Sequence, residues 1–172
     1  REGEEPELLV AWRAIAAPRP LLVIVPRHPQ RFDAVAELVA NAGFTLSRRS
    51  AWQDDAPPRD AIGCDVWLGD SMLEMPAWYA LGEVALLGGS FAPLGGQNLI
   101  EAAACGCPLV LGPHTFNFSD AAELAIAAGA ATRVADIVAG VAAAVALVPP
   151  AATGERARRS AAALAFAGAH RG

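Results

Sequence analysis

The sequence has little that would suit an extracellular, membrane-spanning or zinc-binding protein. It has three cysteines, Cys64, Cys105 and Cys107, with no C-x-x-C pair and no Cys/His spacing typical of zinc, so we expect free thiols in a reducing compartment. No apolar stretch reaches the roughly 18–20 residues that a membrane span needs without a charge or a helix breaker. The opening, REGEEPELLV, is too charged for a signal peptide.

An excess of positive charge is also missing. The net charge is -5 and the pI is near 5.1, which disfavours a nucleic-acid partner because phosphate backbones are held mainly by Lys and Arg. A local anion site built from backbone N–H groups stays compatible with this charge. Hydrophobic residues make up 54% of the 172 residues and charged residues 18%, so a sizeable core can be buried in a domain of ordinary size. The start, without an initiator Met, suggests a fragment of a longer protein.

Common motifs for ligands and catalysis are absent as well. The first strand–helix turn lacks the dinucleotide fingerprint G-x-G-x-x-G, and the phosphate loop G-x-x-x-x-G-K-[ST] does not occur. The sequence offers no Ser/His/Asp triad and no cluster of metal ligands. We therefore expect no metal and no cofactor in this chain.

The sequence does contain short apolar runs that alternate with helical periodicity about six times. This alternation predicts an α/β fold, a Rossmann-like open parallel sheet with helices on both faces. The expected strands lie within residues 19–26, 44–49, 65–69, 83–89, 108–113 and 131–134. The expected helices lie within residues 4–17, 31–43, 74–82, 98–106, 119–130, 135–148 and 153–167.

One stretch, GGSFAPLGGQNLIEAAACGCPLVLGP from Gly88 to Pro113, indicates a ligand site. Its glycine pairs let backbone approach a ligand closely, and the helix that follows would offer unpaired N–H groups to a phosphate. Asn98 and Glu101 are three residues apart and face one side, where the Glu101 carboxylate would accept hydrogen bonds from both hydroxyls of a ribose. The pattern predicts a nucleotide site. Alternatively, the glycines only form tight turns and Glu101 only complements the helix dipole.

Further candidates follow other strands, because ligands bind beyond the carboxyl ends of parallel strands. Arg27 suits phosphate or carboxylate through its forked guanidinium, with an ordinary surface charge as the alternative. His28 is either a ligand contact or a structural histidine, and Met72 either packs against a base or belongs to the core. Ser90 would donate to a phosphate or stabilise a turn.

Three segments, taken together, resemble the Kdo (3-deoxy-D-manno-oct-2-ulosonic acid) transferases that act on lipid A. They are LLVIVPRHPQRFD, DSMLEMPAWYALGEVALLGGS and GGSFAPLGGQNLIEAAACGCPLVLGPHTFNFSDAAELAIAAGAA, which run in the family's order and cover roughly residues 1–135. The resemblance implies one half of a GT-B glycosyltransferase with CMP-Kdo as donor. It implies that residues 1–172 are the C-terminal nucleotide-sugar-binding domain, without the N-terminal acceptor domain. The nucleotide-sugar-binding residues would be Arg27, His28, Met72, Gly89, Ser90, Gly96, Gln97, Asn98 and Glu101.

What the family has elsewhere is not found in this chain. The proposed catalytic base, an N-terminal glutamate, and the membrane-anchoring N-terminus have no counterpart. The resemblance therefore implies a lipid A precursor as acceptor through the missing domain, and a place at the cytoplasmic face of the inner membrane. Two positions depart from the family pattern, which usually has His at Gln97 and often Gly at Leu73.

Two other functions stay open from the residues alone. One is a GT-B glycosyltransferase or an epimerase that uses a UDP-sugar and has a different base pocket. The other is a non-catalytic Rossmann-like module that serves interaction or regulation. The absence of any nucleotide binding would favour the second, and a comparison of CMP with UDP separates the first from a CMP-Kdo enzyme.

Overall fold

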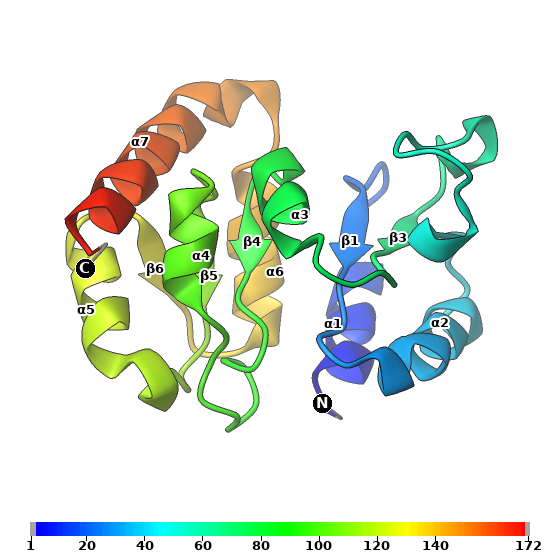
Figure 1. Ribbon diagram of the computed structural model, residues 1–172, viewed down its shortest axis with the longest axis horizontal. Coiled ribbons are helices and arrows are strands. Elements are labelled where there is room, and N and C mark those ends of the chain that lie inside the picture. Colours follow the sequence, from blue (N-terminus) through cyan, green and yellow to red (C-terminus); the bar gives the residue numbers. More distant parts are fainter. Residues whose placement is uncertain (1–2, 171–172) are drawn as a thin grey trace. The chain divides into compact units, whose positions relative to one another are not determined.

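The computed structural model describes residues 3–170 and divides into two compact units (Figure 1). The first unit extends to Met75, and the second begins at Pro76. Each unit is built around its own parallel sheet of three strands.

The sheet of the first unit has the order β1-β3-β2, so β3 (Val66–Leu68) is the central strand. β1 (Leu22–Ile24) and β2 (Leu46–Arg48) both pair with it in parallel, and Leu22 and Leu46 are both opposite Val66. α1 and α2 pack against one another, and α2 also contacts β2 and β3. The remaining elements of this unit are α1 (Glu4–Arg13), α2 (Phe32–Asn41), η1 (Pro29–Arg31), η2 (Arg49–Ala51) and η3 (Arg59–Ala61).

Alternation along β3 explains how this unit forms its core. Val66 and Leu68 are fully buried, whereas Trp67 points to the opposite face of the strand. There Trp67 meets Trp52 edge-on, with ring centroids 5.1 Å apart. Both indole N–H groups find acceptors within the unit, so neither ring leaves a polar group unpaired: Trp67 donates to Ala61 O and Trp52 to Ser47 Oγ.

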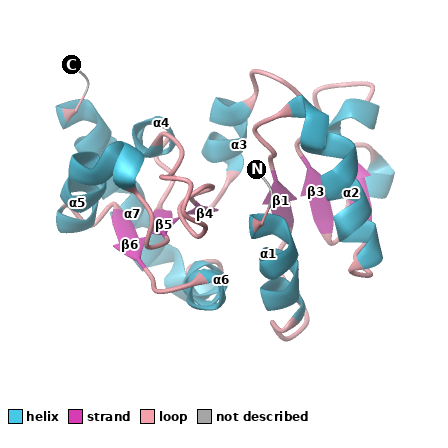
Figure 2. Ribbon diagram, turned by 90° about the horizontal axis from the view of Figure 1, so that it is seen from below, coloured by secondary structure: helices cyan, strands magenta, loops and turns pink. Residues whose placement is uncertain are grey.

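The sheet of the second unit has the order β4-β5-β6, the same as the order along the chain. α4, α5 and α7 pack together on one face, and α6 contacts β4 and β5 on the other (Figure 2). The elements are α3 (Met75–Leu81), β4 (Ala85–Leu86), α4 (Leu99–Ala104), β5 (Leu109–Leu111), η4 (Phe116–Phe118), α5 (Ser119–Ala127), β6 (Ala131–Arg133), α6 (Ile137–Ala146), η5 (Pro150–Ala152) and α7 (Thr153–Ala169).

The core of the second unit lies between its sheet and the helices α4, α5 and α7. Leu99 of α4 and Leu109 and Leu111 of β5 are buried there together with Phe166 of α7. Much of the rest of this core is alanine, whose small side chain lets helices approach closely. Gly106, just after α4, would place a Cβ 3.2 Å from Ser160 Oγ of α7. In this unit the apolar run 109–111 becomes the fully buried strand β5, and the Ala-rich segments become the helices that cover it.

The predicted α/β class with parallel strands is confirmed, and each predicted strand occurs within its expected range. The strands are divided between two three-stranded sheets, whereas we expected one open sheet. The three cysteines are free thiols, as predicted. In residues 3–170 no single helix is long and apolar enough to cross a membrane. The bent helix pair Ile137–Ala146 and Pro150–Ala169 has the length and composition of a membrane span, and only these two properties suggest one.

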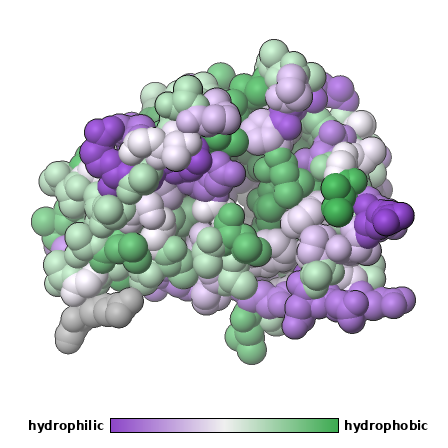
Figure 3. Space-filling model, turned by 90° about the horizontal axis from the view of Figure 1, so that it is seen from above, coloured by the Kyte–Doolittle hydropathy of each residue, from purple (hydrophilic) through white to green (hydrophobic). Residues whose placement is uncertain are grey.

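Large exposed apolar side chains come from many different elements. On the face shown in Figure 3, the most hydrophobic residues stand in separate groups among polar ones. The more exposed examples are Val10, Ile62, Leu73, Leu81, Phe116 and Val138. Scattered exposure of this kind is normal at protein surfaces, so each position needs its own explanation where one exists.

Two helical glycines give a test of the packing. Gly140→Ala in α6 would place a Cβ 2.8 Å from Phe91 Cε1, and we expect it to lower the free energy of unfolding by about 1–2 kcal/mol through overpacking. Gly154→Ala in α7 meets no atom within 4 Å and should raise it by about 0.5–1 kcal/mol through helix propensity. Chemical denaturation of both variants measures the two signs; equal effects would contradict this account of α6.

Candidate functional site

In the second unit, two loops follow the carboxyl ends of β4 and β5. The loop after β4 holds both glycine pairs of the sequence, and the loop after β5 runs from Gly112 to Phe118. They lie at the edge where parallel α/β sheets bind ligands. The structure of these loops decides which backbone groups of the glycine-rich stretch are free to contact a ligand.

The loop after β4 is closed by hydrogen bonds between its two glycine pairs. Gly96 N donates to Gly89 O at 3.0 Å, and Gln97 N donates to Gly88 O at 2.9 Å. Gly89, Gly95 and Gly96 all have positive φ angles, between 78° and 94°, which L side chains rarely adopt. The glycines therefore form tight turns, which was the alternative to a ligand site. The same turns leave a loop whose glycines carry no side chains.

Asn117, in η4, fastens the tip of this loop to the loop after β5. Its backbone N donates to Gly95 O at 3.0 Å, and its side-chain Nδ2 lies 3.3 Å from both Leu94 O and Gly96 O. A Cβ on Gly95 would come within 2.5 Å of that same Nδ2. Glycine is thus required at this position twice, by its φ angle and by the amide of Asn117.

Ser90 joins the two loops at their base. Its side chain is fully buried, its Oγ donates to Leu87 O at 2.6 Å, and the same Oγ accepts from Gly112 N at 2.9 Å. Ser90 O also accepts from His114 N at 2.9 Å. These contacts favour the turn-stabilising role of Ser90 over direct donation to a phosphate, because the hydroxyl proton already has an acceptor.

Arg133, the last residue of β6, holds the loop after β5 from the other side. One guanidinium nitrogen donates to Gly112 O at 2.9 Å, and another donates to Thr115 Oγ1 and to Glu123 at 3.1 Å. Sequence reasoning did not single out Arg133. Its place directly at the end of a strand, the position that made Arg27 a candidate, was the available signal.

Asn98 and Glu101 lie at the start of α4. The Asn98 side chain is the N-cap, accepting from Ile100 N at 3.1 Å and Glu101 N at 3.4 Å. This cap takes up two of the N–H groups that we expected to be free for a phosphate, since a capping oxygen satisfies them first. The carboxylate of Glu101, in contrast, is half-buried and has no hydrogen-bond or ion-pair partner among residues 3–170.

The charge of Glu101 acts on Tyr79, a partly buried tyrosine of α3. Burial, together with the Glu101 carboxylate, raises the pKa of Tyr79 to about 12. Burial likewise raises the pKa of the Cys107 thiol to about 12, with a contribution from Cys105. Both groups are therefore neutral at physiological pH.

In the first unit, β1 and β3 are neighbours, so the residues that follow them lie at the same edge of one sheet. Arg27 and His28 follow β1. Arg27 is exposed, and among the arginines that the structure describes its guanidinium and that of Arg59 are the two without a hydrogen-bond or ion-pair partner. An unpaired guanidinium at this edge fits the predicted anion contact.

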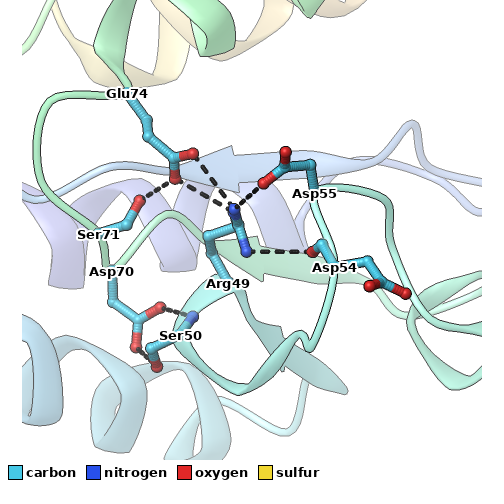
Figure 4. A network of polar contacts seen from close by, with 7 residues as sticks. All are labelled: Arg49, Ser50, Asp54, Asp55, Asp70, Ser71 and Glu74. Atoms are coloured by element: carbon cyan, nitrogen blue, oxygen red, sulfur yellow. Dashed lines mark hydrogen bonds and ion pairs between the residues drawn. The ribbon is translucent and has the colours of Figure 1, made fainter.

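The loop after β3 is held by a network of arginines and carboxylates (Figure 4). Asp70 is buried and accepts from Arg48 Nε at 2.7 Å, from Ser50 N at 2.8 Å and from Ser50 Oγ at 2.6 Å. Burial opposes ionisation of Asp70, but these hydrogen bonds outweigh it and hold the pKa of Asp70 below its usual value. Asp70 is therefore an ionised, fully bonded anchor.

Glu74 is the second anchor of this loop. Ser71 Oγ donates to Glu74, and Arg49 Nε and Nη2 donate to its two oxygens at 3.1 and 3.2 Å. The hydrogen bond from Ser71, followed by that from Arg49, holds the pKa of Glu74 below its usual value. Arg49 also lies 3.2 Å from Asp55. The pairing of Arg48 and Arg49 with Asp70 and Glu74 depends on β2 lying beside β3, so the sequence alone did not predict it.

The structure thus brings the predicted residues together within each unit. In the second unit they line one closed loop and the helix behind it: Gly89, Ser90, Gly96, Gln97, Asn98 and Glu101. In the first unit Arg27, His28 and Met72 follow two adjacent strands. Met72 is 56% exposed, so it does not belong to the core. Residues 3–170 contain no group of three or more His, Cys, Asp or Glu side chains arranged to hold a metal.

Comparisons with known proteins identify similar structures and sequences. A solved structure from Acinetobacter baumannii, the C-terminal CMP-Kdo binding domain of WaaA, superimposes with a TM-score of 0.84 at 32% identity, over 96% of this chain and 84% of that one. A 3-deoxy-D-manno-octulosonic acid transferase of Bordetella pertussis is 53% identical over 141 residues, 79% of this chain and 32% of the relative. The Haemophilus influenzae enzyme of the same name is 40% identical over 120 residues, 69% of this chain and 27% of the relative.

The parallel α/β architecture and its match define a GT-B-type domain. The chain belongs to the family of 3-deoxy-D-manno-octulosonic acid transferases. It spans between a quarter and a third of the length of the two curated relatives described above. No family model matches the sequence.

The buried carboxylate of Asp70 makes a prediction about stability. Asp70→Asn should lower the free energy of unfolding at pH 7 by about 2–3 kcal/mol, the scale of hydrogen bonds to a charged group. Because the folded-state pKa of Asp70 lies below its usual value of 3.8, this stabilisation is complete above that value and is lost as the pH falls through the folded-state pKa. Urea denaturation from pH 7 to pH 3 should show the two proteins converging at the acid end.

The matched control is Asp33→Asn. Asp33 binds the same arginine, Arg48, at 2.8 Å, but its side chain is 94% exposed against 1% for Asp70. An exposed ion pair contributes little, so the control should be much less destabilising. Equal losses in the two variants would contradict the role assigned to Asp70.

Proposed function

We propose that this chain binds the CMP-Kdo donor of a Kdo transferase. The observation that carries the proposal is the unpartnered carboxylate of Glu101 behind the closed glycine loop, because adjacent hydroxyls of a ribose would satisfy it. Family membership and the match to a CMP-Kdo binding domain support the choice of donor. A UDP-sugar enzyme and a non-catalytic module are the alternatives that the experiments below separate from it.

In the second unit, we assign the phosphate and the ribose. Gly89 offers a phosphate a backbone without a Cβ, and Gly96, which is buried, keeps the turn closed by donating its N–H to Gly89 O. Ser90 fixes the base of the loop, and the side chain of Gln97 and the Nδ2 of Asn98 offer donors next to it. The N-terminus of α4 is not assigned to the phosphate, because the Asn98 side chain already accepts from two of its N–H groups.

In the first unit, we assign three contacts. Arg27 carries an unpaired guanidinium that suits either the donor's phosphate or its carboxylate. His28 follows it and would add a further polar contact. Met72 offers an exposed thioether side chain to the cytosine ring.

The reaction that these contacts would serve is a displacement at the anomeric carbon of Kdo. The bond from that carbon to a phosphate oxygen of CMP breaks, and a bond to a hydroxyl of the lipid A precursor forms. CMP leaves with an additional negative charge, which the guanidinium of Arg27 would stabilise. We assign the base that takes the hydroxyl proton, the acceptor contacts and the attachment to the inner membrane's cytoplasmic face to the part of the longer relatives that this chain does not match.

Glu101 gives the sharpest test of this assignment. Glu101→Ala should weaken CMP binding by about 1.5–3 kcal/mol, and Glu101→Gln should lose part of that because an amide has one acceptor oxygen. The unmutated chain should bind deoxy-CMP more weakly than CMP, whereas Glu101→Ala should bind the two about equally. Titrations followed by NMR, with UMP and UDP beside CMP, measure these affinities and the choice of base.

The outcomes separate the alternatives. If Glu101 only complements the helix dipole, its removal costs a few tenths of a kcal/mol of stability, and discrimination between CMP and deoxy-CMP survives. Tighter binding of UDP than of CMP would favour the UDP-sugar enzyme. No binding of any nucleotide would favour the interaction module.

A further inference from the structure

Leu73 is a leucine in an unfavourable place. Its φ is 64°, in the left-handed region that a leucine occupies only at a cost, and it is the only described non-glycine residue with positive φ. Its side chain is 96% exposed, so it gains nothing from burial within the chain. Glycine would fit the backbone better, and a polar residue would suit the solvent better. Strained backbone positions of this kind cluster at functional sites.

The network of Figure 4 keeps Leu73 in this conformation. Asp70, three residues before Leu73, is fixed to Arg48 and Ser50, and Glu74, directly after it, is fixed to Arg49 and Ser71. Both anchors bind the segment that follows β2. With its two ends held, the loop between them has little freedom to relax the backbone of Leu73.

The same network leaves an apolar pair of side chains exposed. Met72 is 56% and Leu73 96% exposed, although the residues on either side of the pair, Ser71 and Glu74, are less exposed. The guanidinium groups of Arg48 and Arg49 are engaged by carboxylates. The tip of the loop is therefore apolar above neutralised charges.

We propose that Leu73 forms, with Met72, an apolar contact for the face of the donor's pyrimidine ring, and that Arg49 is the positioning residue that holds this contact in place through Glu74. The inference rests on the proposed function. The apolar contact is assigned to the donor because the loop lies beyond the carboxyl end of β3, where a parallel sheet binds ligands. A flat ring face gains from contact with apolar and thioether groups and needs no hydrogen bonds from them.

The first experiment replaces Leu73 by glycine. Leu73→Gly should weaken CMP binding by about three- to tenfold through lost apolar contact, while the melting temperature stays unchanged or rises because the strain is relieved. UMP should weaken by the same factor, since a contact with the ring face does not distinguish the ring's edges. In the unmutated chain, nuclear Overhauser contacts should join the base protons of bound CMP to the methyl groups of Met72 and Leu73.

The second experiment tests the positioning role. Arg49→Ala should weaken CMP binding by about two- to fivefold, and Arg49→Lys should restore part of the loss by donating to one oxygen of Glu74. The double variant Arg49→Ala with Leu73→Gly should lose less CMP affinity than the sum of the two single losses, because part of the effect of Arg49 passes through Leu73. The control is Arg19→Ala, whose guanidinium donates to Trp12 O and Arg13 O ahead of β1, and it should leave CMP binding unchanged.

The results distinguish this inference from the proposed function. Unchanged CMP affinity in Leu73→Gly, or bound CMP without contacts to the methyl groups of Met72 and Leu73, would overturn the inference and leave the donor assignment standing. Additive losses in the double variant would overturn the positioning role of Arg49. Absence of CMP binding to the unmutated chain would overturn both.

Discussion

The buried contact between Ser90 and Gly112 is the constraint on which the two loops after β4 and β5 depend. A single hydroxyl donates to Leu87 O and accepts from Gly112 N, so two backbone groups that could not reach water are satisfied at once. A Cβ on Gly112 would come within 2.4 Å of Ser90 O, which leaves room there for glycine alone. The glycine loop, Asn117 and Arg133 all take their positions from this junction.

Local chemistry predicted the elements of the fold well. The apolar run of residues 19–26 is bounded by prolines and has no room for a helix, and the segment 98–106 ends in a glycine that adopts a positive φ of 72°. Pairing of strands could not be predicted in this way. Whether β2 pairs with β1 or with β3 depends on packing between distant residues, and the division into two three-stranded sheets has no local signature.

The candidate site shows the same limit. Glycines with special backbone angles are visible in the sequence, and so is a carboxylate one turn into a helix. The roles of Ser90, Asn98 and Arg133 depend on which backbone groups reach them, and those groups are up to 22 residues away in the chain, as for Gly112 and Ser90. Asn98 illustrates the point, because its amide oxygen could meet a ligand or cap its own helix, and the backbone angles decide.

The different strand orders of the two sheets bear on how the units form during synthesis. In the second unit each new strand adds beside the strand made before it, so the sheet grows in the order of the chain. In the first unit β1 and β2 are not neighbours, and both wait for β3. Until Leu68 has left the ribosome, the edges of β1 and β2 stay unpaired. This interval is when a chaperone that shields exposed strand edges would matter most.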